Sequence, residues 1–239
     1  MKKLVGGLVV AAILIFAARF ALGAIIGGNN HSDIHVDKDK VKSLEVALDV
    51  GVGKLSVTGG ADEWLEGTID HEDSRYKPRV SYKRSGKEGR IKVTQEKKGF
   101  GNFHFGKADN DWNLSLNDDV PIDLRVDAGV SDASLDLRGL KLANLDVDAG
   151  VGDVEINLAG EWKDGFKANV QMGVGKTTII LPKDTGVKVI ADKGIGKINI
   201  DGFTKKGDNV YVNDAFEDAK TIIIVNAELG IGDANFILK

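Results

Sequence analysis

Residues 145–156 read LDVDAGVGDVEI, in which apolar and polar residues alternate on both sides of a Gly-Val-Gly-Asp motif. The motif occurs six times in related forms, and four of the copies follow one another at intervals of 21, 23 and 21 residues. A constant interval near twenty residues is typical of a protein built from stacked repeats. The first glycine of each copy, which we call the corner glycine, is Gly51, Gly129, Gly150, Gly173, Gly194 or Gly230.

Each copy has the pattern of a strand, a corner and a second strand. The residues one, three and five positions before the corner glycine are nearly all apolar, and so are those one, four, six and eight positions after it. Alternation by two predicts strands with one buried face. The step of three after the corner predicts a bend that keeps the apolar face inward. Because all copies keep the corner glycine, we expect a positive φ or a stacking contact too close for a Cβ. The second glycine is replaced once, by Ser131, which predicts a weaker constraint there.

Such units bury their inner face only when they stack about 4.8 Å apart. We therefore predict that residues 43–239 form an all-β, single-stranded, right-handed β-solenoid, preceded by one N-terminal hydrophobic helix, with a sandwich-like relative as the alternative. In coils that follow the order of the sequence, the charged residues three positions after the corner glycine would stack as a ladder of Asp132, Asp153, Lys176 and Lys197.

The first 28 residues have the pattern of a membrane anchor or a signal segment. Two lysines precede an apolar run from Leu4 to Ala18, Arg19 interrupts it, and a second apolar run ends at Gly28. A helix carried through to Ile26 would span about 34 Å, enough to cross a bilayer. Cleavage near Gly23 is the alternative. Both interpretations place the body outside the cytoplasm, either as a single-pass protein of the cell membrane or as a secreted one. Residues 29–42 are polar and predict a linker.

Composition and motifs argue against catalysis. The chain has no cysteine, which excludes disulfides and zinc–thiolate sites. Residues 173–178 resemble the end of a phosphate-binding loop, but Val170 stands where that motif needs glycine, and a strand pattern follows in place of a helix. His31 and His35 fall in the predicted linker, and His71 and His104 have no evident partner in the sequence. We expect no catalytic residue, metal site, cofactor or nucleic-acid partner.

Charge is distributed unevenly over a chain whose net charge is −4. Residues 75–98 hold ten lysines and arginines against two glutamates and include an alternating pattern that predicts a hairpin. Anionic lipid or an anionic wall polymer would suit this basic segment, and a solvated hairpin is the alternative. The candidate binding residues are Arg79, Lys83, Arg84, Arg90 and Lys92.

Two further features remain open at this stage. Carboxylates or a glutamine stand two positions before each corner glycine, which predicts an outward ladder that either binds a cation or is only solvated. The glycine-rich segment 99–106 holds three phenylalanines and would either fold onto the core or form a contact tip. The ladder consists of Asp49, Asp127, Asp148, Gln171, Asp192 and Glu228.

These features together resemble the toast-rack domains of bacterial envelope proteins, including the C-terminal domain of LiaF-like stress regulators. The resemblance lies in residues 44–60, in residues 112–116 with 120–124, in the Gly-Val-Gly-Asp motifs and in residues 201–203. It implies a non-catalytic, extracytoplasmic β-solenoid that binds a partner. LiaF-like proteins restrain a membrane histidine kinase, but they usually have several hydrophobic segments, and this chain has one. From the resemblance as a whole we expect an interaction module that regulates or scaffolds envelope-stress signalling, with a sensor kinase or another envelope protein as partner. The alternative is an adhesin-like or anionic-glycan-binding surface protein.

Overall fold

The structure is a computed structural model that describes residues 30–71, 77–95 and 110–239. Within these ranges strands predominate, and no helix is long and apolar enough to cross a membrane. The predicted N-terminal hydrophobic helix and the segment 99–106 lie outside the described residues.

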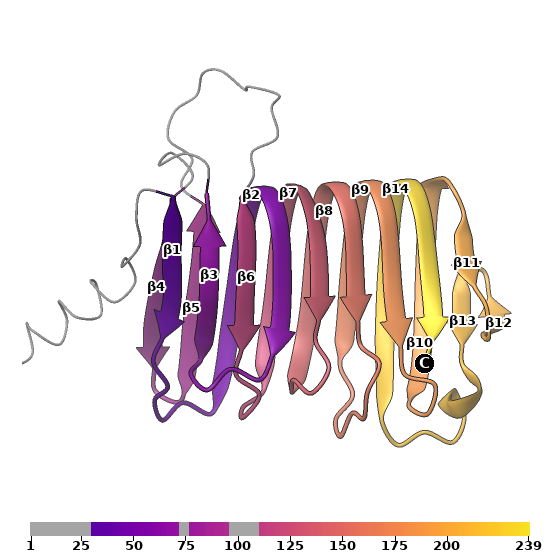
Figure 1. Ribbon diagram of the computed structural model, residues 1–239. Coiled ribbons are helices and arrows are strands. Elements are labelled where there is room, and N and C mark those ends of the chain that lie inside the picture. The colour runs from indigo at the N-terminus through magenta and orange to yellow at the C-terminus, as the bar shows by residue number, and fades with distance from the viewer. Residues whose placement is uncertain (1–29, 72–76, 96–109) are drawn as a thin grey trace, which may run out of the picture.

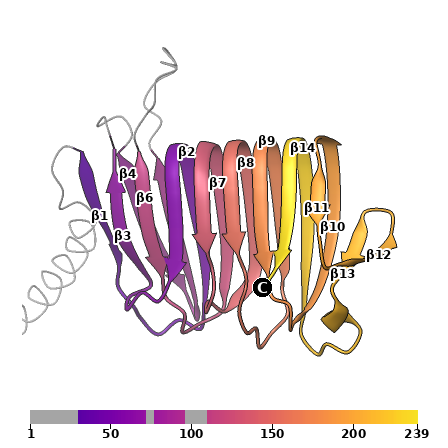
Figure 2. The ribbon, with the colours of Figure 1, turned by 45° about the vertical axis from the view of Figure 1, so that its right-hand side comes forward.

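Fourteen strands of the described ranges form one continuous sheet, which Figures 1 and 2 show as a row of bent strands lying side by side. The bends lie along one edge, the corner edge, and the loops that join successive coils lie along the opposite edge (Figure 1). The strands are β1 (His31–Val36), β2 (Ser43–Gly59), β3 (Leu65–Asp70), β4 (Pro78–Ser85), β5 (Glu88–Gln95), β6 (Asp111–Leu116), β7 (Ile122–Asp136), β8 (Leu142–Asn157), β9 (Lys167–Leu181), β10 (Gly186–Ile195), β11 (Ile198–Ile200), β12 (Thr204–Gly207), β13 (Val210–Val212) and β14 (Ile222–Leu238), with one 3-10 turn, η2 (Asp214–Phe216).

The long strands β2, β7, β8, β9 and β14 run through a corner, so each contributes to two layers (Figure 1). Their first halves form a first layer, which ends in the hairpin β4–β5 on one side and in β10, β13 and β12 on the other. Their second halves form a second layer, which continues into β6, β3 and β1 at one end and into β11 at the other. The long strands pair in parallel, so equivalent positions of the repeat lie side by side.

The core lies between the two layers and follows the predicted alternation. In β8, for example, the buried residues are Leu145, Val147, Ala149, Val154 and Ile156. One cluster of buried side chains runs through the whole described chain, from Ile34 to Phe236. Each large aliphatic side chain buried in this way stabilises the fold by about 1.5–3 kcal/mol. The all-β stacked-repeat architecture is therefore as predicted.

Close stacking requires a glycine at five of the six corner positions, Gly129, Gly150, Gly173, Gly194 and Gly230, and the second glycines carry the stronger constraint. A Cβ on Gly150 would lie 2.4 Å from the carbonyl oxygen of Gly129 in the next strand. At Gly175 the φ angle is +146°, and a Cβ would lie only 1.7 Å from the carbonyl oxygen of Gly152. The prediction of a weaker constraint at the second glycine is wrong. Ser131 escapes this constraint because its φ is not positive.

The aliphatic residue directly after the corner glycine points to solvent in five of the six copies, which corrects the expectation that it faces inward. Among these five its exposed fraction ranges from 44% at Val174 to 71% at Ile195, whereas Val52 in the first copy is half-buried. In β8 burial stops at Ala149 and resumes at Val154, so the whole bend lies outside the core. The sequence pattern indicated that the alternation of inward and outward side chains changes phase after Val151. In the structure it changes directly after Ala149.

The coils do not follow the order of the sequence. β14, at the C-terminus, lies between β9 and β10 and pairs in parallel with both. The paired neighbour of Lys176 on this side is consequently Asp233, and Lys197 lies one strand further along. The predicted neighbours Lys176 and Lys197 are therefore wrong, whereas Asp153 and Lys176 are paired as expected.

The polar segment 29–42 is not a linker, because it contains β1. This strand pairs with β3 and buries Ser32, Ile34 and Val36 on alternate positions. The outward side chains of His31 and His35 contact carboxylates, and the hydrogen bond between His31 and Asp70 (2.5 Å) raises the pKa of His31. The solenoid therefore begins at residue 31 and not at residue 43.

Candidate functional site

The predicted hairpin is present as β4–β5, and it forms the end of the first layer. Its two strands are antiparallel, with Lys83 opposite Arg90 and Arg79 opposite Thr94. The inward side chains Ile91 and Val93 are fully buried, so the alternate positions Arg90 and Lys92 face outward. Burial of the apolar face in the core between the two layers thus fixes the direction of the basic side chains.

The five predicted binding residues do not form one uniform patch. Arg84 lies on the face opposite Lys83 and pairs with Asp39 (3.6 Å). Arg90 donates to Glu45 (2.7 Å) and lies 3.4 Å from Glu88. Lys83 and Lys92 are exposed, and among the described residues neither has an ion pair. The charge available to a ligand is therefore concentrated on Lys83 and Lys92, beside the exposed Arg79.

The acidic ladder of the first layer exists as predicted. Asp49 pairs with Asp127, Asp127 with Asp148, and Asp148 with Gln171, after which Glu228 and Asp192 complete the row. Arg125 binds Asp127 through two hydrogen bonds of 2.9 and 3.0 Å. Nowhere in the described ranges do three or more histidine, aspartate or glutamate side chains gather in a way that could hold a metal ion.

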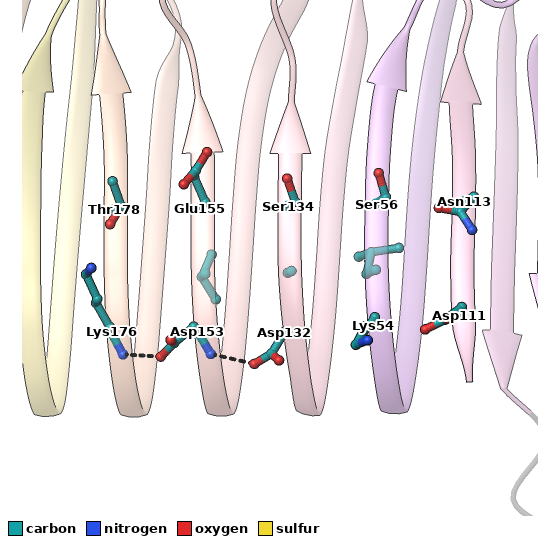
Figure 3. A pocket seen from close by; sticks show the side chains of 13 residues that line it. Lys54, Ser56, Asp111, Asn113, Asp132, Ser134, Asp153, Glu155, Lys176 and Thr178 are labelled. Atoms are coloured by element: carbon teal, nitrogen blue, oxygen red, sulfur yellow. Dashed lines mark hydrogen bonds between the residues drawn. The ribbon is translucent and has the colours of Figure 1, made fainter. Parts of the chain in front are cut away.

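A shallow polar groove of about 550 Å³ crosses the second layer next to the corner edge (Figure 3). Charged side chains from the turn of each coil form one side of it, and short polar side chains form its middle. Figure 3 shows that these residues form two rows that cross neighbouring strands, a charged row at the bends and a polar row beside it. The labelled residues are Asp111, Lys54, Asp132, Asp153 and Lys176 in the first row and Asn113, Ser56, Ser134, Glu155 and Thr178 in the second.

The aspartates at the bends beside the groove accept hydrogen bonds from backbone amides of the neighbouring strand. The carboxylate of Asp132 accepts a hydrogen bond from the amide of Asp153 (3.1 Å), and that of Asp153 accepts one from the amide of Lys176 (3.1 Å). Asp233 accepts one from the amide of Lys197 in the same way (2.9 Å). These aspartates satisfy amides that the bend removes from the regular ladder, so their first role is structural.

The remaining motifs have structural roles. Residues 173–178 lie within β9, so no helix follows the glycines to bind phosphate. Ser32 Oγ and His71 Nε2 approach to 3.5 Å, but both residues are buried, with exposed fractions of 1% and 3%. A substrate cannot reach this pair from solvent. His104 lies outside the described residues.

The row of exposed aliphatic residues is the surface that the sequence analysis missed. Five of the six large apolar side chains exposed in the described ranges occupy this one position of the repeat. The signal was present as an invariant Val or Ile in every copy, but the alternation assigned it to the core. We call this row the aliphatic ridge; it consists of Val130, Val151, Val174, Ile231 and Ile195.

Known proteins resemble this chain in sequence and in structure. The family model for the N-terminal domain of toast_rack, DUF2154, matches residues 25–180. A crystal structure of a "putative cell adhesion protein" from Clostridium sporogenes ATCC 15579 is 30% identical, with a TM-score of 0.81, and the match covers 87% of this chain and 99% of that chain. The similarity therefore extends over nearly the whole stacked-repeat domain, residues 31–239, which we call the rack.

More distant structures add nothing to this comparison. A "putative adhesin" from Bacteroides fragilis NCTC 9343 is 15% identical over 88% of this chain and 98% of that chain, with a TM-score of 0.31. Another from Parabacteroides merdae ATCC 43184 is 14% identical over the same shares, with a TM-score of 0.23. No curated protein matches the chain.

Proposed function

This chain belongs to the toast-rack family, and we propose that it is a non-catalytic binding module on the outer side of the cell membrane. In this proposal the hairpin β4–β5 contacts an anionic polymer or lipid headgroups of the cell envelope. The relative from Clostridium sporogenes, called a "putative cell adhesion protein", supports a role in surface contact.

The observation that carries the proposal is the pair of exposed, unneutralised lysines on the hairpin. Lys83 and Lys92 project from the same outward face at the end of the first layer. Two exposed ammonium groups attract a polyanion, and salt weakens this attraction by screening the charges. The acidic ladder further along the same layer would confine such a ligand to the hairpin end.

The leader supports the proposed location. Its lysines precede an apolar stretch that would be long enough to span a bilayer if it continued through Arg19 to Ile26, and this pattern favours a location of the following residues outside the cytoplasm. The rack begins at residue 31, only a few residues later. A membrane-embedded leader would hold the rack directly against the outer surface of the membrane.

A protein partner within the envelope is the second candidate. The observation in its favour is the aliphatic ridge, since exposed apolar rows are typical of protein contacts. A regulatory role of the kind that LiaF-like proteins have would use such a surface. The hairpin and the ridge lie on different parts of the rack, so one protein can have both contacts.

We predict that replacing both exposed lysines of the hairpin weakens anion binding. The variant with Lys83→Gln and Lys92→Gln, in nanodiscs of neutral lipid, should bind poly(glycerol phosphate) about thirtyfold more weakly at low salt, because each charge contributes about 1 kcal/mol. Titration calorimetry at two salt concentrations measures the effect, and anionic nanodiscs without polymer distinguish lipid from polymer.

A matched variant separates this effect from a general loss of positive charge. Lys183→Gln with Lys205→Gln removes two exposed lysines outside the hairpin and should leave the affinity unchanged. Equal losses in the two double variants, or no salt-dependent binding by the wild-type protein, would contradict the proposed role of the hairpin.

A further inference from the structure

The aliphatic ridge is a continuous row along the corner edge. Its members are paired in register from strand to strand: Val130 with Val151, Val151 with Val174, Val174 with Ile231, and Ile231 with Ile195. Four strand spacings give the row a length of about 19 Å. The side chains are between 44% and 71% exposed.

The fold itself does not require apolar side chains at these positions. They lie outside the core, on the convex side of the bend, and their neighbours in each bend are polar or glycine. A β-branched side chain suits an extended backbone, but threonine would meet that preference equally well. The choice of valine or isoleucine at every rung therefore indicates a contact that excludes water.

The charges beside the ridge restrict what can cover it. On the first layer the acidic ladder runs parallel to the ridge, three residues away in each strand. Gln171 separates Asp148 from Glu228 in this ladder, and Arg125 binds Asp127, so among the described residues the carboxylates without an ion pair beside the ridge are Asp148, Glu228 and Asp192. These three give this side of the ridge its negative charge. On the second layer the row from Lys54 to Lys197 contains both signs. A ligand of the ridge should consequently carry positive charge along one side of an apolar stripe.

We propose that the ridge binds a basic amphipathic α-helix of a partner protein. The helical pitch of 5.4 Å is close to the strand spacing of about 4.8 Å, so one apolar side chain of the helix can meet each rung. A ridge of 19 Å corresponds to about 13 residues of helix. Lysines or arginines on the helix flank then meet the acidic ladder.

The place where the chain enters the rack supports a partner in the same membrane. The register joins His31 to Asp70, Asp70 to Asp111, and Asp111 to Lys54, which is three residues from its corner glycine. Residue 30 thus lies at the corner edge.

This inference deepens the second candidate function above, and it is independent of the hairpin. The acidic ladder disfavours the bilayer itself as the occupant, since anionic headgroups would be repelled.

Binding of designed helices to the full chain in nanodiscs of phosphatidylcholine tests the proposal. The probes are two fluorescent 14-residue helices with the same leucine stripe, one flanked by lysines and the other by glutamates, and anisotropy is read against empty nanodiscs. We expect the lysine-flanked helix to bind at least tenfold more tightly. Equal affinity of the two helices would overturn the proposal.

Matched variants locate the site. The triple variant V130T, V151T and V174T keeps the β-branched shape and should bind the lysine-flanked helix at least tenfold more weakly. Ile237→Thr changes an exposed isoleucine of the second layer and should have no effect, nor should Lys83→Gln with Lys92→Gln. If the triple variant loses stability, Val151→Thr alone should weaken binding about threefold. Wild-type affinity of the ridge variants would overturn the proposal.

Two other occupants give distinct results in the same preparation. A fluorophore on Val151→Cys reports lipid when brominated phosphatidylcholine quenches it, and sedimentation reports a dimer that the threonine variants abolish. Either result would assign the ridge to the bilayer or to a second copy and overturn the helix proposal.

Discussion

Replacing Gly175 with alanine should destabilise the protein by about 3 kcal/mol or more. At φ +146° a residue with a side chain is strained by about 1–3 kcal/mol. The new Cβ would also lie 1.7 Å from the carbonyl oxygen of Gly152, so the two strands must separate at the corner. The midpoint of urea unfolding, read by circular dichroism, measures the effect.

Two comparisons make this result specific. Gly160→Ala is the control, because its Cβ would lie 4.0 Å from the nearest atom and its φ is not positive; the change should be within about 0.5 kcal/mol. Gly150→Val should cost about 1–3 kcal/mol, because its Cβ would lie 2.4 Å from the carbonyl oxygen of Gly129. The cost is smaller than at Gly175, because φ is not positive at Gly150 and no backbone strain is added. Wild-type unfolding of Gly175→Ala would contradict the geometry of the corner.

Much of the rack was predictable because the interval between the repeated motifs can be read directly from the sequence. Buried positions such as Leu145, Val147 and Ile156 follow from alternation by two, and the stacking contact at Gly150 follows from the glycine that every copy keeps. The hairpin β4–β5 was also predictable, because a turn sequence separates two alternating strands. These features depend on local patterns that a single strand already contains.

The phase of the corner and the order of the coils could not be predicted, for physical reasons. Five steps separate Ala149 from Val154, so an alternating face must change phase between them, but the pattern does not say where. The rungs are nearly equivalent, so β14 satisfies the same contacts between β9 and β10 as it would at the end. β1 was missed because only Ile34 and Val36 are apolar in it.

The candidate site was predictable only in part. Sequence alternation placed Lys83 and Lys92 outward, but the pairing of Arg90 with Glu45 and of Arg84 with Asp39 depends on neighbouring strands. Those contacts join residues about 45 positions apart, which no local pattern specifies. The aliphatic ridge became visible only when the corner geometry showed which way its side chains point.

Deleting residues 221–239 should abolish cooperative folding of the C-terminal half of the rack. β14 is paired on both sides, with β9 and with β10, so its removal opens the middle of the sheet. The buried side chains lost contribute on the order of 10 kcal/mol, which is comparable to the whole stability of a typical domain. They are Ile223, Val225, Ala227, Leu229, Ala234 and Phe236. Limited proteolysis should then cleave β9 to β13 rapidly.

A pair of cysteine variants tests the same strand order without a deletion. The chain has no cysteine, so any disulfide is the introduced one. Lys176→Cys with Asp233→Cys joins paired positions one strand spacing apart and should oxidise readily. Lys176→Cys with Lys197→Cys spans two spacings and should remain reduced. A disulfide between positions 176 and 197 but none between positions 176 and 233, together with a truncated protein that resists proteolysis up to residue 212, would contradict this strand order. The coils would then follow the order of the sequence.

Site-specific photocrosslinking in intact membranes tests most directly whether the rack functions through its surfaces. A photoreactive residue is placed at Lys83, at Val151 and, as the comparison, at Asn199 on the second layer. We predict anionic polymer or lipid at position 83, a protein at position 151 whose crosslinked peptide is a basic amphipathic helix, and little product at position 199. Equal crosslinking from all three positions, or none from positions 83 and 151, would contradict the account.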